Sequence, residues 1–322
     1  MTSLPETIAG ILRTAPDALI VCHVAPDGDC LGSALALALA CGQAGVRAVV
    51  GSADGVPEAY RTLPGGDRIA GVPPEGRFSV GVAMECSTLD RAGAFAESLA
   101  RCRTLINIDH HLSNAGYGNI VYWDTSAAAV GELVHVIIRA MGAEVTADMA
   151  QCLLTAVVTD TGSFRFPNTT PATLRLAADL MDRGASVHAV VERVYETRSA
   201  ASLRLMGQAL GRLTLSPDGR IAWTTITPQM MQATGALPED TSGIVGMLRQ
   251  IRGVKIALVF EEGPGGIRVS IRSRDGVRSN VVAEVLGGGG HQGAAGFALP
   301  GALEEIVART MAEVEKELRA AR

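Results

Sequence analysis

Three short segments of the chain concentrate side chains that bind metal ions. They are the stretch from His23 to Asp29 (His-Val-Ala-Pro-Asp-Gly-Asp), the run Asp109-His110-His111, and Asp160 within residues 159–162. Each follows an apolar stretch, so we expect all three at one edge of a sheet. Carboxylate and imidazole ligands without thiolate favour hard or borderline divalent ions such as Mn²⁺ or Mg²⁺ over structural zinc. Two such ions side by side are suited to hydrolysing phosphate esters.

The stretch from His23 to Ser33 admits a structural and a functional interpretation. A Pro-Asp-Gly turn, with Asp29 capping the helix that follows, would explain the aspartates alone. A turn does not need His23, however, and two carboxylates at the start of a helix repel each other unless a cation lies between them. We therefore interpret His23, Asp27 and Asp29 as metal ligands.

The other two segments extend this hypothesis. Adjacent histidines at a strand end point in different directions, so one can bind metal while the other meets substrate, and Asp109 can orient a ring. Asp160 lies at a predicted helix end, where its charge opposes the helix dipole unless a cation compensates it. The residues that follow, Phe164, Arg165 and Asn168, either line a nucleotide site or form a solvated loop.

A glycine-rich run, residues 287–290, precedes His291 and a stretch of small residues. Consecutive glycines that open towards a helix can form a nest of backbone N–H groups for an anion, whereas the alternative is a flexible hinge. Four arginines lie on or after one predicted strand: Arg268, Arg272, Arg274 and Arg278. Because alternate strand residues face opposite sides, we take Arg272 and one neighbour as candidates for contact with phosphate or base.

Apolar strand-like runs alternate with helical segments in the first part of the chain. The predicted strands are residues 18–22, 46–50, 78–84 and 104–108, and a predicted helix over residues 31–43 follows the first of them. This alternation predicts an α/β domain with a mainly parallel sheet flanked by helices. In such sheets ligands bind beyond the carboxyl ends of the strands, where His23, Glu85 and Asp109 lie.

Helical apolar spacing dominates residues 126–212, and strands return towards the end of the chain. The predicted helices are 126–141, 147–158, 171–183, 186–210, 242–251 and 302–319, and the later strands are 220–226, 254–260 and 266–271. We therefore expect an N-terminal domain over residues 1–185, a helical linker over 186–212 and a smaller α+β domain over 213–322. A cleft between the two domains is expected to hold the substrate.

Composition narrows the class of protein. The chain has 322 residues, 48% of them hydrophobic and 19% charged, as in an ordinary two-domain globular protein. Its net charge of −5 argues against binding to long duplex nucleic acid, which needs an extended basic surface. The six cysteines show no paired spacing, and we find neither a secretion signal nor an apolar stretch long enough to span a bilayer. We therefore expect a cytoplasmic protein that does not bind membranes, and its apolar helices are compatible with a homodimer.

Taken together, these residues resemble the DHH phosphoesterase superfamily, whose name derives from the Asp-His-His motif. The Gly-Gly-Gly-His run resembles the nucleic-acid-binding domain that often accompanies it, and the motifs occur in the expected order over nearly the whole chain. The resemblance implies two divalent metal ions, Mn²⁺ first, with Mg²⁺ or Co²⁺ as alternatives. The ligands that it implies are His23 and Asp27 for one ion, and Asp29, His110 and Asp160 for the other.

The residue that bridges the two ions departs from the family pattern. This position is Glu85 here, where the family normally has Asp. The extra methylene moves the carboxylate by about 1 Å, a displacement that can cost about a hundredfold in rate. Either the glutamate still bridges because the backbone recedes, or one metal binds weakly. Two functions therefore stay open: an active hydrolase, and a nucleotide-binding regulator with impaired catalysis.

Within the superfamily, the compact length and the Gly-Gly-Gly-His run most resemble the bacterial nano-RNases. The resemblance implies a hydrolase that cleaves short oligoribonucleotides such as dinucleotides to mononucleotides, or 3′-phosphoadenosine 5′-phosphate to AMP. The sequence does not rank these substrates against linear products of cyclic dinucleotides. His111, oriented by Asp109, would stabilise the transferring phosphoryl group. The residues expected to hold the rest of the substrate are Arg165, Arg272, Gly289, Gly290 and His291.

Overall fold

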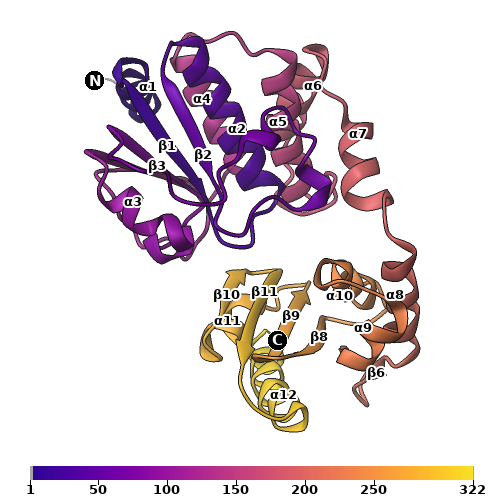
Figure 1. Ribbon diagram of the computed structural model, residues 1–322. Helices are drawn as coiled ribbons and strands as arrows, with labels where there is room; N and C mark the ends of the chain where they lie inside the picture. Colours follow the sequence, from indigo (N-terminus) through magenta and orange to yellow (C-terminus); the bar gives the residue numbers. More distant parts are fainter. Residues whose placement is uncertain (1–2, 322) are drawn as a thin grey trace. The chain divides into compact units, whose positions relative to one another are not determined.

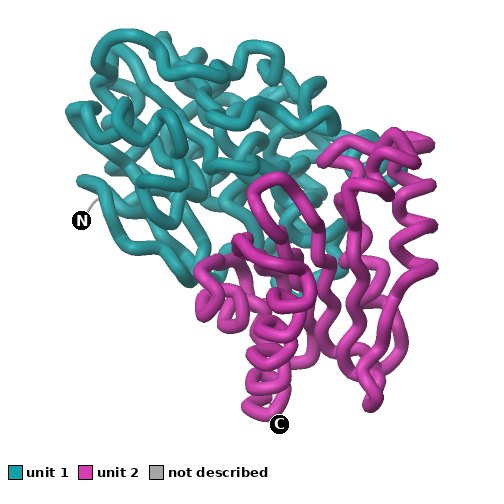
Figure 2. Tube along the Cα trace, turned by 60° about the horizontal axis from the view of Figure 1, so that its bottom comes forward, with its two compact units in different colours: residues 1–197 teal, residues 198–322 magenta. Residues whose placement is uncertain are grey.

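A five-stranded parallel sheet organises the first part of the chain, as the alternation of strands and helices predicts. Its strands are β1 (Asp17–Cys22), β2 (Arg47–Gly51), β3 (Val80–Met84), β4 (Thr104–Asp109) and β5 (Ile120–Trp123), in the spatial order β2-β1-β3-β4-β5. The computed structural model describes residues 3–321. It divides into two compact units, Met1–Thr197 and Arg198–Arg322, which Figure 2 draws in different colours.

Helices cover both faces of the sheet in unit 1 (Figure 1). They are α1 (Leu4–Thr14), α2 (Gly28–Gln43), α3 (Ala96–Ala100), α4 (Val130–Ala140), α5 (Ala147–Asp160), α6 (Pro171–Asp182) and α7 (Val187–Val191), with 3₁₀ turns η1 (Glu58–Tyr60), η2 (Gly66–Arg68) and η3 (Leu89–Phe95). Ile20 of β1 shares the main core with α1, α2, α4 and α5. Leu19 and Val21 point to the opposite face, where Phe95 and Leu99 cover them. Both faces of β1 are therefore buried, which explains its unbroken apolar sequence.

Four details differ from the prediction. Strand β5 was missed, since its four residues are only half-buried at the sheet edge. The predicted strand 78–84 begins at Val80, and the predicted helix 126–141 begins at Val130. The predicted helix 186–210 is divided: α7 runs into the π-helical turn η4 (Glu192–Glu196), and the chain is extended at Thr197 before the next helix begins at Ala200.

Unit 2 contains a mixed sheet with helices, as expected for a smaller α+β domain. Its strands are β6 (Thr214–Leu215), β7 (Ile221–Ile226), β8 (Ile256–Gly263), β9 (Gly266–Ser273), β10 (Gly289–His291) and β11 (Ala294–Leu299), in the order β10-β11-β9-β8-β7-β6. Its helices are α8 (Ala200–Gly211), α9 (Pro228–Thr234), α10 (Ile244–Arg249), α11 (Ser279–Val285) and α12 (Leu303–Ala320), with the 3₁₀ turn η5 (Pro238–Thr241). α12 and α11 cover one face of the sheet, whereas α8 and α10 cover the other.

The glycine run of unit 2 forms a β-hairpin, so the prediction that it opens towards a helix is wrong. β10 pairs antiparallel with β11, and Gly290 lies opposite Ala295. A Cβ at Gly290 would lie 2.5 Å from the carbonyl oxygen of Ala294, and one at Gly288 would collide with that of Gly296. The close approach of two backbones therefore requires these glycines.

No helix among residues 3–321 combines the length and apolar character needed to cross a membrane.

The contact between α2 and α5 depends on a glycine. A Cβ at Gly32 would collide with the carbonyl oxygen of Cys152, whereas one at Gly42 in the same helix has no neighbour within 4 Å. We expect Gly32→Ala to lower the free energy of unfolding by about 1–3 kcal/mol, because it overpacks a rigid backbone contact. Gly42→Ala is the matched control and should be neutral or slightly stabilising. Urea denaturation measures both, and equal stability of the two variants would contradict this account.

Candidate metal centre

The register of the parallel strands gathers the predicted ligands at one edge of the sheet. Cys22 of β1 lies opposite Met84 of β3, which lies opposite Ile108 of β4. The next residues along these strands therefore emerge together: His23 from β1, Glu85 from β3 and Asp109 from β4. His23 is 5% exposed and Glu85 is 2% exposed, so both carry polar groups into the interior.

The carboxylate of Glu85 lies between two histidine rings. Its Oε2 is 4.0 Å from Nε2 of His23, and its Oε1 is 3.4 Å from Nε2 of His110. Nε2 of His23 also lies 3.8 Å from Oδ1 of Asp27. On the other side, Nε2 of His110 lies 4.0 Å from Oδ2 of Asp29 and 3.7 Å from Oδ2 of Asp160. All six predicted metal ligands are therefore near neighbours, in two groups that share Glu85.

Backbone contacts orient both rings. Nδ1 of His23 lies 2.7 Å from the carbonyl oxygen of Val24, and Nδ1 of His110 lies 3.0 Å from that of Ala127. A ring whose Nδ1–H donates to a carbonyl presents its Nε2 to the centre, the arrangement typical of metal-binding histidines.

The two aspartates at the start of α2 have different partners. Asp27 is the N-cap of α2, and its Oδ1 accepts the N–H of Cys30 at 3.0 Å. Asp29 does not cap its own helix, so the structural interpretation of that residue is wrong. Its carboxylate instead accepts the backbone N–H groups of Val130 (2.6 Å) and Gly131 (2.9 Å) at the start of α4. The hydroxyl of Ser33 also donates to Asp29, at 3.0 Å.

Asp160 is the last residue of α5, as the sequence predicts. Burial and the neighbouring Asp29 carboxylate raise the pKa of Asp160 to about 8. Burial and the carboxylates of Asp29 and Asp27 likewise raise the pKa of Glu85 well above its usual value. The negative charges are thus too crowded to coexist without a cation.

The donor set fits divalent cations. Ligand atoms bound to one such ion at about 2.1 Å lie roughly 3–4 Å from one another, which is the spacing around Glu85. The buried Oε2 of Glu85 has no hydrogen-bond partner among residues 3–321. The cluster offers carboxylate oxygens and imidazole nitrogens, and no protein cation in the described part of the chain balances its negative charge. These residues are therefore suited to hold a metal ion.

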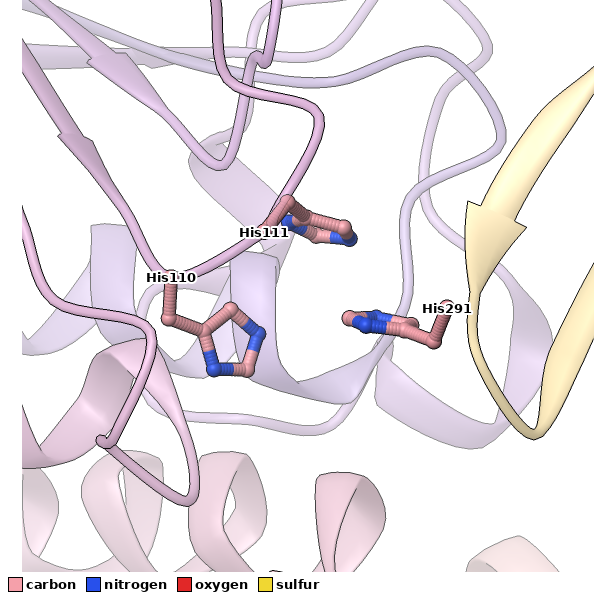
Figure 3. A group of neighbouring side chains, drawn as sticks. All are labelled: His110, His111 and His291. Atoms are coloured by element: carbon pink, nitrogen blue, oxygen red, sulfur yellow. The ribbon is translucent and has the colours of Figure 1, made fainter. Parts of the chain in front are cut away.

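Asp109 and His111 form a separate pair beside the ligands. Oδ1 of Asp109 lies 2.7 Å from Nδ1 of His111 and accepts the backbone N–H groups of both following residues. Burial raises the pKa of Asp109, but the hydrogen bonds from His111 and Asn114 outweigh it and hold the pKa at about 2. The rings of His110 and His111 are nearly perpendicular, with an interplanar angle of 88° (Figure 3). His110 thus presents its Nε2 to the carboxylates, whereas Asp109 orients the ring of His111.

The predicted substrate residues of unit 2 lie on its sheet. Arg272 is on β9, and His291 is on the edge strand β10 with Gly289 and Gly290 (Figure 3). Pro238, Glu239, Arg268, Ser270 and Arg272 are among the residues that line a cavity of about 220 Å³. Burial and the nearby Arg249 lower the pKa of Arg272, so its charge is held without a compensating carboxylate.

The other arginines near β9 have structural partners. Arg268 binds Glu261 at 2.5 Å, and Arg278 binds Glu317 at 2.8 Å. Arg274 donates to the backbone carbonyls of Val254 and Ile251. Among these four arginines, Arg272 and Arg274 thus have no carboxylate partner within residues 3–321, and the guanidinium of Arg272 donates to the carbonyl oxygen of Ile271 at 2.9 Å.

Arg165 lies in the loop after α5, on the surface of unit 1. Its Nε donates to the carbonyl oxygen of Gly162 at 2.6 Å, and its guanidinium lies 5.8 Å from the ring centroid of Tyr195. The structure does not place it in contact with the metal ligands.

Two residues of the site were missed by the sequence interpretation. Ser33 follows Asp29 by four residues within α2, a spacing that puts both on one helix face and could have indicated their contact. Arg91 lies in η3, and its Nη2 is 3.3 Å from Nδ1 of His23. Because 68 residues separate Arg91 from His23, no local pattern could have indicated that contact.

Sequence comparisons link the chain to known proteins. The model of the DHH family, N-terminal domain, matches residues 17–157, and the DHHA1 domain matches residues 226–319. The bifunctional oligoribonuclease and PAP phosphatase NrnA of Thermus thermophilus is 35% identical over 318 residues, which are 97% of this chain and 93% of that protein. The protein of the same name from Bacillus subtilis is 32% identical over 198 residues, which are 61% of this chain and 62% of that protein.

A solved structure shares the whole fold. It is an exopolyphosphatase-related protein from Bacteroides fragilis, which matches with a TM-score of 0.91 and 25% identity over 99% of this chain and 97% of its own. These matches and the buried cluster identify a hydrolase of the phosphodiesterase and phosphatase type. The chain belongs to the DHH family and carries a DHHA1 domain.

Replacing Asp160 tests whether repulsion between the clustered carboxylates destabilises the metal-free protein. Because its folded-state pKa of about 8 is above the usual value of about 3.9, the folded metal-free protein binds more protons than the unfolded chain. Its stability should therefore fall as the pH rises from about 4 to 8. We expect Asp160→Asn to stabilise the metal-free protein at pH 8 by about 1–2 kcal/mol and to have little effect near pH 4, since it removes a buried charge.

Thermal unfolding with EDTA and with Mn²⁺ measures this prediction. Asp160→Asn should also shrink the stabilisation that Mn²⁺ produces. Asp182→Asn is the control, because Asp182 is likewise the last residue of a helix but is exposed. A destabilised Asp160→Asn protein that keeps the full response to Mn²⁺ would contradict the account.

Proposed function

We propose that this chain is a metal-dependent hydrolase that releases mononucleotides from short oligoribonucleotides such as dinucleotides, or converts 3′-phosphoadenosine 5′-phosphate to AMP. The names of its relatives from Thermus thermophilus and Bacillus subtilis support this substrate class. The observation that carries the proposal is the position of Glu85, with one carboxylate oxygen towards His23 and the other towards His110.

We propose two metal ions at this centre, with Mn²⁺ as the first candidate and Mg²⁺ or Co²⁺ as alternatives. The ligands of one would be His23 and Asp27, those of the other would be Asp29, His110 and Asp160, and Glu85 would serve both. Such ions polarise a phosphoryl oxygen and lower the pKa of a bound water.

The remaining residues position the substrate. His111, held by Asp109, presents a hydrogen-bond donor that can stabilise the charge on the transferring phosphoryl group. Arg272, with Gly289, Gly290 and His291, would hold the other phosphate or the base from unit 2, and Arg165 would contribute from unit 1. A partly buried guanidinium without a carboxylate partner, as in Arg272, suits an anionic ligand.

We also propose the domain bounds, the cellular location and the oligomeric state that the sequence predicts. They are a catalytic domain over residues 1–185, a linker over 186–212, a substrate-binding domain over 213–322, a cytoplasmic location and a homodimer. The alternative function, a nucleotide-binding regulator with impaired catalysis, rests on the glutamate at position 85. The reach of Glu85 to both histidines favours the hydrolase instead.

Hydrolysis of a diadenylate in the presence of Mn²⁺ tests the proposed function. We expect release of AMP from the dinucleotide and of phosphate from 3′-phosphoadenosine 5′-phosphate, and no product after treatment with EDTA. Chromatography of the products measures both reactions. An inactive protein with Mn²⁺, Mg²⁺ and Co²⁺ alike would rule out the hydrolase.

A Glu85→Asp variant in the same assay separates the two functions. If Glu85 already serves both metal groups, the shorter side chain should lower the rate, by up to about a hundredfold, because the carboxylate withdraws by roughly 1 Å. A large gain in rate would instead show that the natural chain is catalytically impaired. Glu97→Asp, on α3, is the control for the same chemical change at an exposed position.

Loss of Arg272 should weaken substrate binding more than the chemical step. We expect Arg272→Ala to raise KM by about tenfold with a smaller change in kcat, because a charged hydrogen bond of roughly 1.5–3 kcal/mol is removed. Arg309→Ala, at an exposed position of α12, is the control. Steady-state kinetics with the dinucleotide measure the effect, and an unchanged KM would argue against a role for this arginine.

A further inference from the structure

We propose that Arg91 binds a phosphate oxygen of the substrate beside the metal centre, on the side of His23. This inference rests on the proposed function and adds a substrate contact to it. Arg91 lies six residues after Glu85, in the 3₁₀ segment η3 that follows β3. Its side chain is exposed, and its Nη2 lies 3.3 Å from Nδ1 of His23.

The backbone of Arg91 is held against the segment that carries the first metal ligands. Its carbonyl oxygen accepts the N–H of Val24 at 2.7 Å, and its own N–H donates to Thr88 at 3.1 Å. Gly93 closes the turn with a φ of +57°, and a Cβ there would lie 2.8 Å from side-chain atoms of both Val24 and Ala53. The guanidinium is therefore carried on a fixed turn, although it is exposed.

The charge of Arg91 has no carboxylate partner among residues 3–321. Three other exposed arginines of unit 1 do bind a carboxylate: Arg47 binds Asp17, Arg61 binds Glu58, and Arg101 binds Glu97. The guanidinium of Arg91 instead contacts Nδ1 of His23, which already contacts the carbonyl oxygen of Val24. The planar fork of donors on Arg91 thus stays available to a further acceptor.

The position of the Arg91 guanidinium beside His23 argues against a merely structural role for Arg91. A guanidinium beside His23 opposes the binding of a cation by that residue, since like charges repel. The unfavourable interaction is offset when an anion bridges the guanidinium and the metal centre. Phosphate is suited to this because arginine binds two of its oxygens in a planar, bidentate arrangement. The exposure of the guanidinium allows such an anion to reach it.

Phosphate binding to the Mn²⁺-loaded protein tests the inference directly. Isothermal titration calorimetry with inorganic phosphate compares the natural protein with Arg91→Ala, Arg91→Lys and Arg101→Ala. We expect Arg91→Ala to weaken phosphate binding by about tenfold or more, which corresponds to the loss of one charged hydrogen bond. Arg91→Lys should lie in between, because a lysine keeps the charge but not the planar fork. Arg101→Ala, the control at an exposed arginine paired with Glu97, should leave it unchanged.

The affinity for Mn²⁺ separates substrate binding from positioning of His23. Removing a positive charge near His23 should leave the Mn²⁺ affinity of Arg91→Ala equal to or higher than that of the natural protein. Weaker Mn²⁺ binding, or unchanged phosphate binding in both Arg91 variants, would overturn the inference. Arg91→Lys keeps the test decisive if the alanine variant does not fold.

The failure of this inference is distinguishable from that of the proposed function. If the natural protein hydrolyses the dinucleotide and both Arg91 variants match its kcat/KM and phosphate affinity, Arg91 has no such role and the hydrolase stands. If the natural protein is inactive, the proposed function fails, and the phosphate titration still decides whether Arg91 belongs to an anion site.

Discussion

The structure of unit 1 depends on holding four carboxylates close together around Glu85, although the carboxylate of Asp27 is itself exposed. Asp27, Asp29, Glu85 and Asp160 come from three different elements. Burial, together with repulsion between the carboxylates, raises the pKa of Asp29, Glu85 and Asp160. The protein compensates this repulsion with the start of α4, whose N–H groups bind Asp29, and with imidazole rings fixed by backbone carbonyls. Such a cluster is unfavourable by itself and becomes favourable when cations occupy it.

The parallel sheet and the glycines of α2 make this crowding geometrically possible. Strand ends that lie in register deliver His23, Glu85 and the Asp-His-His run to one edge, and the start of α2 then adds two aspartates. Asp160 joins them because α2 and α5 approach closely, where a Cβ at Gly28 would meet Thr159 at 2.5 Å. Packing deep in the unit therefore determines the distances between ligands at its edge.

The clustering of the predicted ligands could be anticipated from the sequence because most of its signals are local. A strand followed at once by His, Glu or Asp places that side chain at the edge of a parallel sheet, and the helix end at Asp160 followed from the apolar spacing of α5. The class of fold followed from the same alternation. These features need only short-range patterns and the general geometry of α/β sheets.

What could not be predicted depends on contacts distant in the chain. Arg91 meets His23 only because the turn after β3 folds back onto Val24, and Asp29 meets the start of α4 across about a hundred residues. The prediction for the glycine run, residues 287–290, was wrong because two motifs require consecutive glycines. One is a nest of N–H groups for an anion, and the other is a hairpin whose backbones approach closely. Gly290 shows the difference, since it pairs with Ala295 and its missing side chain is explained by that neighbour.

Glu85 illustrates how the local backbone accommodates a longer carboxylate side chain at this edge of the sheet. Its φ of +54° lies in the left-handed region, which costs a residue other than glycine about 1–2 kcal/mol. The N–H of Glu85 nevertheless donates to Ile108 at 2.9 Å, so the change in direction begins at its own Cα, after the last regular hydrogen bond of β3. That turn of the backbone sets where the longer side chain starts and lets its two oxygens face His23 and His110. The backbone strain is thus located at Glu85, the residue between the two groups of predicted ligands. An aspartate on a regular extended strand would start from a different backbone position.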